Sequence, residues 1–235
     1  MEEEKNNESA NNESGGSEVF SGDIKPDRKK SMGREIWEWT YTLFLAVALT
    51  FSIKYFFFDI VRVDGPSMLP TLEDQQRLII SKFGYTPEVG DIIILDSRYD
   101  LRKEYMEHEK GGESFVSKYL PLLISEKDLR PRYYVKRVIA LPGQTVDFSA
   151  DGKVLIDGKE LDESAYYDGV TRPTDRSITY PLTVEENRVF VMGDNRSVSK
   201  DSRSGELGTV DYNAIAGKAQ FRIMPFNKIG GLYKK

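Results

Sequence analysis

The apolar run Ile36–Phe58, IWEWTYTLFLAVALTFSIKYFFF, restricts what this chain can fold into more than any other part of its sequence. A helix needs ~20 consecutive, mostly apolar residues to cross a bilayer, and this run supplies them. Its two charged residues, Glu38 and Lys54, lie near its ends, where long side chains reach the polar interface. Aromatic residues flank both ends, as is usual at headgroup level. We therefore predict a transmembrane helix over residues 36–58.

A cleaved signal peptide and a buried soluble helix are the alternatives to this permanent anchor. The small-x-small sequence at Ala46–Ala48 resembles a cleavage site, but it lies inside the apolar run rather than after it. Before the run, Lys25–Arg34 carries five basic residues against one acid. By the positive-inside rule, we expect the N-terminus to be cytoplasmic and the chain after Phe58 to lie outside a cell membrane that it crosses once.

The regions on either side of the run differ in composition. Residues 1–35 form an acidic, Asn- and Ser-rich tail, which we predict to be disordered, followed by the basic flank. Residues 59–235 contain short segments rich in Val, Ile, Tyr and Phe, separated by Gly, Pro, Asp and Asn, which predicts a mostly β, antiparallel domain. Asp157-Gly158 indicates a hairpin. The segments of this kind are 59–63, 77–83, 90–97, 133–141, 153–161, 188–194 and 218–226. The charged segment 98–132, which we expect to be partly helical, interrupts them as an insert.

The composition excludes several kinds of active site. The chain has no cysteine and one histidine, His108, which lies in a charged stretch and reads as a surface residue. Thiol chemistry, thiolate or multi-histidine metal sites and a Ser/His/Asp triad are therefore not expected, and we predict no cofactor. A net charge of −5 argues against nucleic-acid binding. Any activated serine in this chain would need a lysine as its base.

Ser67 is the first candidate for a reactive side chain. It lies in VDGPSMLPTL, residues 63–72, where Gly, Pro and Ser are also typical of an ordinary turn. Pro66 fixes its own φ angle and biases Gly65 towards an extended backbone, so the approach to Ser67 is rigid. Only nine residues separate Ser67 from Phe58, so it lies at most ~30 Å from the membrane boundary.

Lys136, in YYVKRVIALPG, is the candidate base. In a strand it shares a face with Tyr134, Val138 and Ala140, so its ammonium group points towards apolar neighbours. Burial of this kind lowers the pKa of a lysine, as proton abstraction at neutral pH requires. The alternative is an ordinary strand lysine whose charge reaches solvent, and the neighbouring Arg137 shows that charge alone does not decide between the two readings.

The sequence SVSK at Ser197–Lys200 has the Ser-x-x-Lys spacing of penicillin-binding enzymes. The surrounding GDNRSVSKDSRSG is too rich in Gly, Ser and Asp to begin a helix. The companion motifs Ser-Asp-Asn and Lys-Thr-Gly are also absent from the sequence. We therefore reject this reading.

Five ordered motifs resemble those of bacterial type I signal peptidases of the single-anchor kind found in Gram-positive organisms. The resemblance covers roughly residues 36–97 and 133–232, and it implies a membrane-bound serine endopeptidase that cuts secreted preproteins after small residues at the first and third positions before the bond. The motifs are GPSMLPTL after an anchor, GDIIIL, YYVKRVIALPGQTV, GDNRSVSKDSR and GKAQFRIMPF.

The resemblance also assigns roles to single residues. It implies that Ser67 is the nucleophile, that Lys136 is the general base, and that the Ser199 hydroxyl hydrogen-bonds the lysine. Asp201 and Arg203 match a supporting charged pair, and residues 194–196 match a structural turn. We expect the substrate to bind at residues that flank the reactive pair. These are Asp64, Gly65, Tyr134 and Val135.

The chain departs from the family pattern in two places. One is the insert at 98–132, whose apolar run at 114–124 we interpret as a packed decoration, with a membrane contact or partner site as alternatives. The other is Gly65, where some members carry a serine whose hydroxyl serves the oxyanion hole, so the Ser67 amide remains the one donor we can name. Unless Gly65 has a positive φ, we expect Gly65→Ser to fold and to be at least as active.

Two other functions compete with the peptidase. A catalytically silent relative that assists assembly of surface proteins would have no need of both Ser67 and Lys136. A self-cleaving regulator with the same pair should carry a DNA-binding segment, and none is visible in the sequence.

Overall fold

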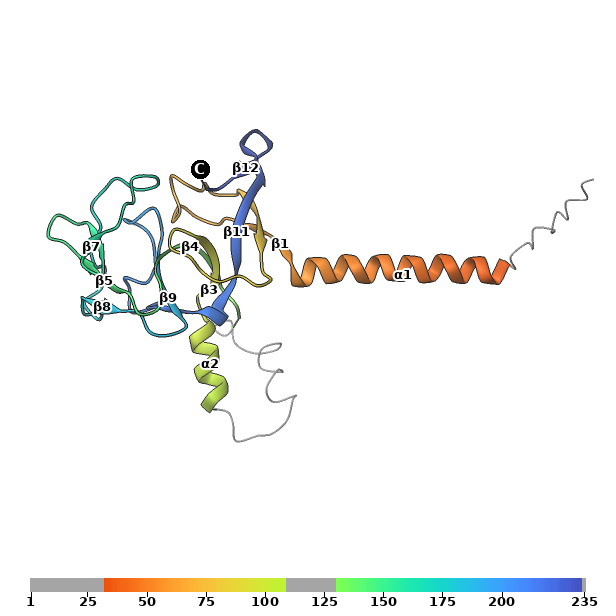
Figure 1. Ribbon diagram of the computed structural model, residues 1–235, viewed down its shortest axis with the longest axis horizontal. Helices are drawn as coiled ribbons and strands as arrows, with labels where there is room; N and C mark the ends of the chain where they lie inside the picture. The colour runs from red at the N-terminus through yellow and green to blue at the C-terminus, as the bar shows by residue number, and fades with distance from the viewer. Residues whose placement is uncertain (1–31, 109–129, 234–235) are drawn as a thin grey trace, which may run out of the picture. The chain divides into compact units, whose positions relative to one another are not determined.

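The computed structural model describes residues 32–108 and 130–233, and its first element is the long helix α1, Met32–Phe56 (Figure 1). The stretch Met32–Lys54 is long and apolar enough to cross a membrane, and none of it is buried by other parts of the chain. The hydroxyls of Thr40 and Ser52 are satisfied within the helix, since each donates to the carbonyl oxygen four residues earlier. The helix begins before the expected Ile36 because Met32–Glu35 continues the same turns.

The β-rich part contains a large antiparallel sheet. Its strands pair in the order β1-β2-β11-β3-β4-β9-β10, and β12 pairs with β11. The chain enters this sheet directly after α1, since α1 ends at Phe56 and β1 begins at Phe58. The strands are β1 (Phe58–Arg62), β2 (Arg77–Ser81), β3 (Ile92–Asp96), β4 (Tyr133–Ala140), β9 (Arg188–Met192), β10 (Val210–Asp211), β11 (Ile215–Met224) and β12 (Gly230–Gly231).

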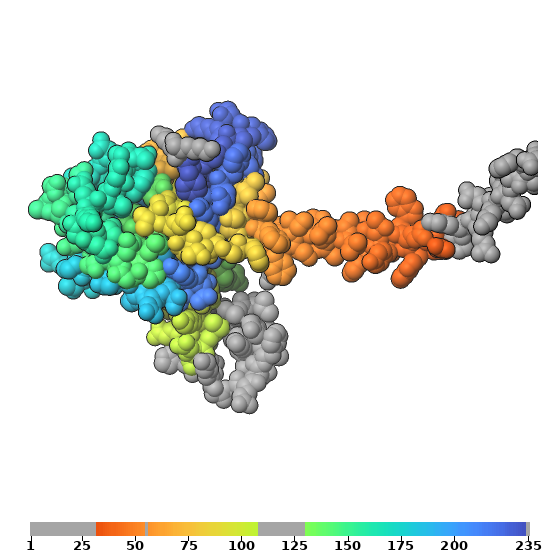
Figure 2. Space-filling view, viewed as in Figure 1, coloured from red at the N-terminus to blue at the C-terminus, as the bar shows by residue number. Residues whose placement is uncertain are grey.

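A second, small sheet pairs in the order β7-β6-β5-β8, and Figure 2 shows these residues, in green and teal, gathered at one end of the β-rich part. The predicted Asp157-Gly158 hairpin is confirmed, because the two residues join β6 to its partner β7. The strands are β5 (Thr145–Phe148), β6 (Val154–Ile156), β7 (Lys159–Glu160) and β8 (Leu182–Thr183). Two 3₁₀ turns, η1 (Tyr212–Ala214) and η2 (Phe226–Lys228), flank β11.

The central strands β3 and β4 hold the core together. Every residue of β3 is buried, and β4 is buried from Lys136 to its end. Their side chains enter three apolar clusters: one around Met68 and Leu72, one around Ile93 and Val138, and one around Phe190. A strand buried on both faces needs a continuous apolar sequence, which explains why the run IIIL reads as uniformly apolar rather than alternating.

The predicted fold class, a β-rich antiparallel domain after one apolar helix, is confirmed. Each strand-like segment contains a strand, but β5, β8, β10 and β12 were not predicted because they are short and weakly patterned. The insert begins with a helix, α2 (Tyr99–His108), of which His108 is the last residue. The tail at residues 1–24 and the apolar run at 114–124 lie outside the described residues.

Candidate functional site

Ser67 lies on a tight turn that two buried side chains hold in place. Met68 and Leu72 are each 0% exposed and belong to the first apolar cluster. The Leu72 amide donates to the Met68 carbonyl at 2.9 Å, and the Leu69 amide donates to the Pro66 carbonyl at 3.1 Å. Ser67 itself is only half-buried. The turn therefore presents the serine hydroxyl while the residues beside it anchor the backbone.

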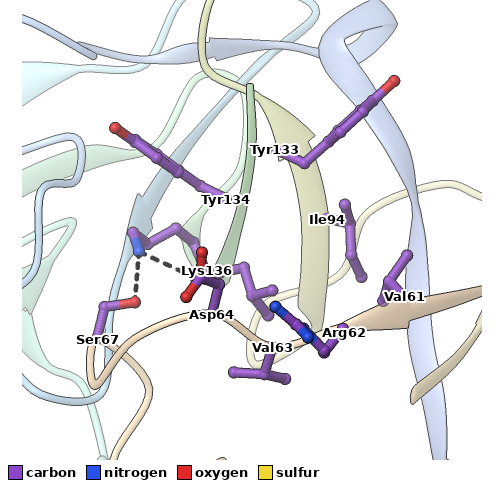
Figure 3. A pocket seen from close by; sticks show the side chains of 10 residues that line it. Val61, Arg62, Val63, Asp64, Ser67, Ile94, Tyr133, Tyr134 and Lys136 are labelled. Atoms are coloured by element: carbon purple, nitrogen blue, oxygen red, sulfur yellow. Dashed lines mark hydrogen bonds between the residues drawn. The ribbon is translucent and has the colours of Figure 1, made fainter. Parts of the chain in front are cut away.

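The Lys136 side chain reaches this hydroxyl from β4. Its Nζ lies 2.9 Å from Ser67 Oγ and donates a second hydrogen bond, 3.0 Å long, to the Val135 carbonyl (Figure 3). The sheet register pairs Lys136 with Ile93 and Tyr134 with Leu95, so these side chains share a face of the sheet. The Tyr134 ring centroid is 5.2 Å from Nζ. The structure thus brings together the two residues that the sequence singled out.

The predicted face of Lys136 needs one correction. Tyr134 and Val138 lie in the second apolar cluster, as expected, but Ala140 belongs to the third. The register of β4 against β9 shifts between Val138 and Ala140, and such a bulge turns the following side chain to another side. Strict alternation from Lys136 to Ala140 was therefore wrong.

Burial changes the acid–base chemistry of Lys136. The side chain is 3% exposed, and this desolvation lowers its pKa from the usual value to about 8. The charges of Asp201 and Asp194 oppose the shift, and that of Arg203 adds to it. A substantial fraction of the amine is consequently neutral near pH 8, and only the neutral amine can accept a proton from a hydroxyl.

The loop after β9 is hydrogen-bonded to the serine turn. The Asn195 amide donates to the Ser67 carbonyl at 3.0 Å, and Thr71 Oγ1 donates to the Asp194 carboxylate. Gly193 makes this approach possible, since a Cβ at that position would lie 2.4 Å from the Ser67 carbonyl oxygen and 2.3 Å from Ser199 Oγ. These are contacts that Cβ atoms essentially never make. The loop thereby fixes the backbone of the candidate nucleophile.

A buried ion pair ties the same loop to β4. Arg137 Nε and Nη2 donate to the two oxygens of Asp194 at 2.8 and 2.7 Å, and Arg137 Nη1 donates to the Gly90 carbonyl at 2.7 Å. The Arg137 guanidinium also lies 3.9 Å from the Tyr166 ring centroid. Nothing in the sequence distinguishes Arg137 from any other arginine of a strand. The only available signal was its place next to Lys136, which puts it on the opposite side of the strand.

The supporting residues that the sequence predicted are partly in place. Asp201 and Arg203 form a buried bidentate pair at 2.8 and 2.9 Å, and Asp201 also accepts the Gly193 amide at 3.1 Å. Ser199 is buried, but its Oγ makes no hydrogen bond. The expected bond from Ser199 to Lys136 is therefore not formed in this structure, in which the Nζ donors go to Ser67 and to the Val135 carbonyl.

A hollow of about 260 Å³ opens beside the pair (Figure 3). Three of the four expected substrate-binding residues, Asp64, Tyr134 and Val135, line it, whereas Gly65 does not. Its walls combine aliphatic, aromatic and charged side chains, and the chain approaching Ser67 forms one side while β4 forms the other. The remaining lining residues, which the sequence did not identify, are Val61, Arg62, Val63, Ile94 and Tyr133.

Gly65 has a φ of +91°, which corrects an expectation drawn from the sequence. Its amide donates to Asp74 Oδ1 at 2.9 Å, and this bond holds the turn. No atom lies within 4 Å of the place where a Cβ would stand, so the obstacle to a side chain there is the backbone conformation and not a lack of space. The Ser67 amide donates to no acceptor within residues 32–108 and 130–233, which leaves it available to an incoming oxygen.

The rejected Ser-x-x-Lys reading has no geometric support. Ser197 Oγ donates to Asn195 Oδ1, and Lys200 Nζ pairs with Glu206 at 3.1 Å. Both residues are exposed and lie outside any helix. Within the part of the chain that the structure describes, no group of three or more His, Asp or Glu side chains is arranged to hold a metal ion.

Comparison with known proteins points to one family. Residues 36–224 match the family described as "Signal peptidase, peptidase S26". A signal peptidase I of Bacillus licheniformis is 34% identical over 213 residues, covering 86% of this chain and 96% of the relative. Signal peptidase I S of Bacillus subtilis strain 168 is 33% identical over 210 residues, covering 85% and 95%. A solved signal peptidase I of Enterococcus faecalis V583 is 26% identical, with a TM-score of 0.34, covering 57% of this chain and 97% of that one.

Gly65→Ser is now expected to impair the protein, because a serine held at a φ of +91° stores about 1–3 kcal/mol of backbone strain. If the turn relaxes, Ser67 moves, and an error of ~1 Å at a reacting atom costs on the order of 100-fold in rate. We predict that Gly65→Ser lowers the unfolding temperature and slows peptide-bond cleavage at least about tenfold relative to the unchanged protein. Gly230→Ser, at a glycine without a positive φ and with open space for a Cβ, is the matched control. An unstrained, fully active Gly65→Ser would contradict this account.

Proposed function

Because the chain belongs to the signal peptidase, peptidase S26 family, we propose that it is a membrane-anchored endopeptidase that removes signal peptides with Ser67 as nucleophile and Lys136 as general base. One observation carries the proposal: Lys136 Nζ lies 2.9 Å from Ser67 Oγ while its side chain is 3% exposed. If Lys136 touched Ser67 but were exposed, it would stay protonated and could not act as a base. If it were buried away from Ser67, it could not reach the hydroxyl proton. The two together make a serine–lysine dyad.

In the proposed first step, neutral Lys136 takes the proton from Ser67 Oγ as this oxygen attacks the carbonyl carbon of the scissile peptide bond. The carbonyl oxygen becomes an oxyanion, and in this proposal the Ser67 amide, which has no acceptor among the described residues, donates to it. Lys136, now an ammonium, returns the proton to the leaving nitrogen when the C–N bond breaks. The products are an ester of Ser67 with the signal peptide and a free amino terminus on the mature protein.

In the second step, Lys136 is neutral again and can activate a water molecule. The water attacks the ester carbon, the lysine takes one of its protons, and the same proton passes to Ser67 Oγ as the ester bond breaks. Neither step uses a metal ion or an organic cofactor. Asp201, Arg203 and the Arg137–Asp194 pair act by holding the loop and the turn in place.

The hollow beside Ser67 supports a preference for small residues before the cut. Its volume of about 260 Å³ suits a short stretch of extended chain with small side chains. Alternate residues of an extended peptide point to the same side, so two small residues at the first and third positions before the bond would enter together. The aliphatic walls from Val61, Val63, Ile94 and Val135 favour apolar groups such as alanine methyls.

The proposed location is the cell membrane, with the lipid bilayer around α1 and the β-rich domain on the outer side. The basic segment before the helix supports this orientation. Secreted preproteins carrying signal peptides are the proposed partners, and they would meet the site close to the membrane because β1 follows α1 directly. The net charge of −5 gives no support for a nucleic-acid partner.

The dyad is tested with Ser67→Ala and Lys136→Ala, each measured by cleavage of a preprotein whose cut is located by mass spectrometry. Since the two residues act as a unit, each variant should lose activity, and the double variant should be no worse than either. Lys136→Arg should also be inactive, because arginine stays protonated. Ser197→Ala, at the exposed serine of the rejected motif, is the matched control and should cleave normally.

Folding is checked for each variant by its unfolding temperature, with Lys136→Met added because it keeps most of the buried stem. Substantial turnover by a folded Ser67→Ala or Lys136→Ala protein would refute the dyad. A wild-type protein that cuts no preprotein would favour the catalytically silent relative instead.

The orientation can be tested cleanly because the chain has no cysteine of its own. We predict that Lys159→Cys, on the exposed strand β7, is labelled in intact cells by a maleimide that cannot cross membranes. Ser9→Cys, in the tail, should be labelled only after lysis. The reverse pattern would overturn the proposed topology.

A further inference from the structure

A second hollow, of about 240 Å³, lies next to the first and shares Tyr134 with it. It is bounded by the end of β3, the start of α2, the start of β4 and the loop after Ser199. The lining residues are Ser97, Arg98, Leu101, Arg132, Tyr134, Lys200, Ser204, Glu206 and Leu207. The mechanism described above uses none of these residues except Tyr134.

The charge of the second hollow is its distinctive property. Three cationic side chains line it, from Arg98, Arg132 and Lys200, against the single acid Glu206. Glu206 pairs with Lys200 at 3.1 Å. Within the described residues, the guanidinium group of Arg132 has no carboxylate partner, and it lies 5.4 Å from the Tyr134 ring centroid. Within residues 32–108 and 130–233, Arg132 is therefore the lining cation whose charge no acidic side chain offsets.

Tyr134 places this charge close to the reacting atoms. One cation, Lys136 Nζ, lies 5.2 Å from the ring centroid and another, Arg132 Cζ, lies 5.4 Å from it. In Figure 3 the Tyr134 ring points away from Tyr133 and stands beside Lys136. An extended peptide advances ~3.3 Å per residue. About three residues therefore cover the distance from Lys136 Nζ across the Tyr134 ring to Arg132.

We propose that this basic hollow binds the first residues of the mature protein, on the leaving side of the cut, and favours acidic side chains at about the second to fourth positions after the bond. The proposal rests on the proposed function. The first hollow is small, and its four aliphatic residues, Val61, Val63, Ile94 and Val135, suit the residues before the cut. A substrate chain that continues past Ser67 and Lys136 leaves the first hollow. The next hollow along its path is the basic one, on the other side of Tyr134.

The expected effect is moderate, because the cations are partly solvated. Exposed ion pairs are worth little individually, so a pair with Arg132 should raise kcat/KM by about 2- to 5-fold for an acidic over a neutral sequence. The preference should fade in salt, because the screening length drops from ~10 Å at 0.1 M to ~3 Å at 1 M.

The test uses the full chain in a neutral detergent and three preproteins that differ only at the second and third residues after the cut, which are Asp-Asp, Asn-Asn or Lys-Lys. We expect kcat/KM to fall in that order, and the Asp-to-Asn ratio to approach one at 1 M salt. Arg132→Gln should reduce the ratio and Arg132→Glu should invert the order. Arg176→Gln, at an exposed arginine outside both hollows, is the matched control and should keep the wild-type ratio.

Cleavage of the Asn-Asn preprotein by the wild type establishes the proposed function whatever the charge series shows. The proposal on the second hollow is overturned if the wild type cuts all three equally, or if Arg132→Gln leaves the ratio unchanged. It is also overturned if the Asp-to-Asn ratio is the same at 0.1 M and 1 M salt, or if the preference appears only after vesicles of anionic lipid are added.

Discussion

The burial of one lysine in strand β4 is the constraint on which the rest of the site depends. An ammonium group is expensive to remove from water, and the structure meets this cost by lowering the pKa of Lys136 to about 8. The side chain still finds two partners, Ser67 Oγ and the Val135 carbonyl, so its nitrogen is not isolated. The apolar neighbours on β3 and β4 that desolvate it are thus as much part of the chemistry as the amine itself.

The acidic and basic side chains around Ser67 and Lys136 hold the serine turn and the loop after β9 in position. Arg137 and Asp194 join β4 to the loop after β9, and Asn195 joins this loop to the Ser67 carbonyl. Asp201 and Arg203 hold the same loop from its other end through the Gly193 amide. Removing one partner from such buried pairs leaves an uncompensated charge, which costs on the order of 3–5 kcal/mol. Ion pairs that take no part in the proposed reaction therefore hold Ser67 and Lys136 in place from both sides.

The sequence predicted the features that depend on local pattern and missed those that depend on pairing between distant segments. The anchor, the β-rich fold and the Asp157-Gly158 hairpin follow from composition, alternation and turn preferences, and Ser67 and Lys136 were found by elimination and by family motifs. Alternation failed at Ala140, because a bulge depends on the partner strand. The Arg137–Asp194 pair and the basic hollow at Arg132 were not predictable, since each is set by contacts between segments far apart in the chain. The positive φ of Gly65 was left open, because glycine adopts either sign of φ and the sequence does not select one.

The central claim is that Lys136 titrates far below an ordinary lysine because it is buried beside Ser67. It is tested most directly by NMR titration of the protein with isotope-labelled lysine side chains, using Lys136→Met to assign the signal. The account predicts that one lysine titrates near pH 8, and that the rate of preprotein cleavage rises with pH through the same value as the neutral amine accumulates. A Lys136 signal that titrates near the unperturbed value of ~10.4, in an enzyme that cleaves at full rate at neutral pH, would contradict it.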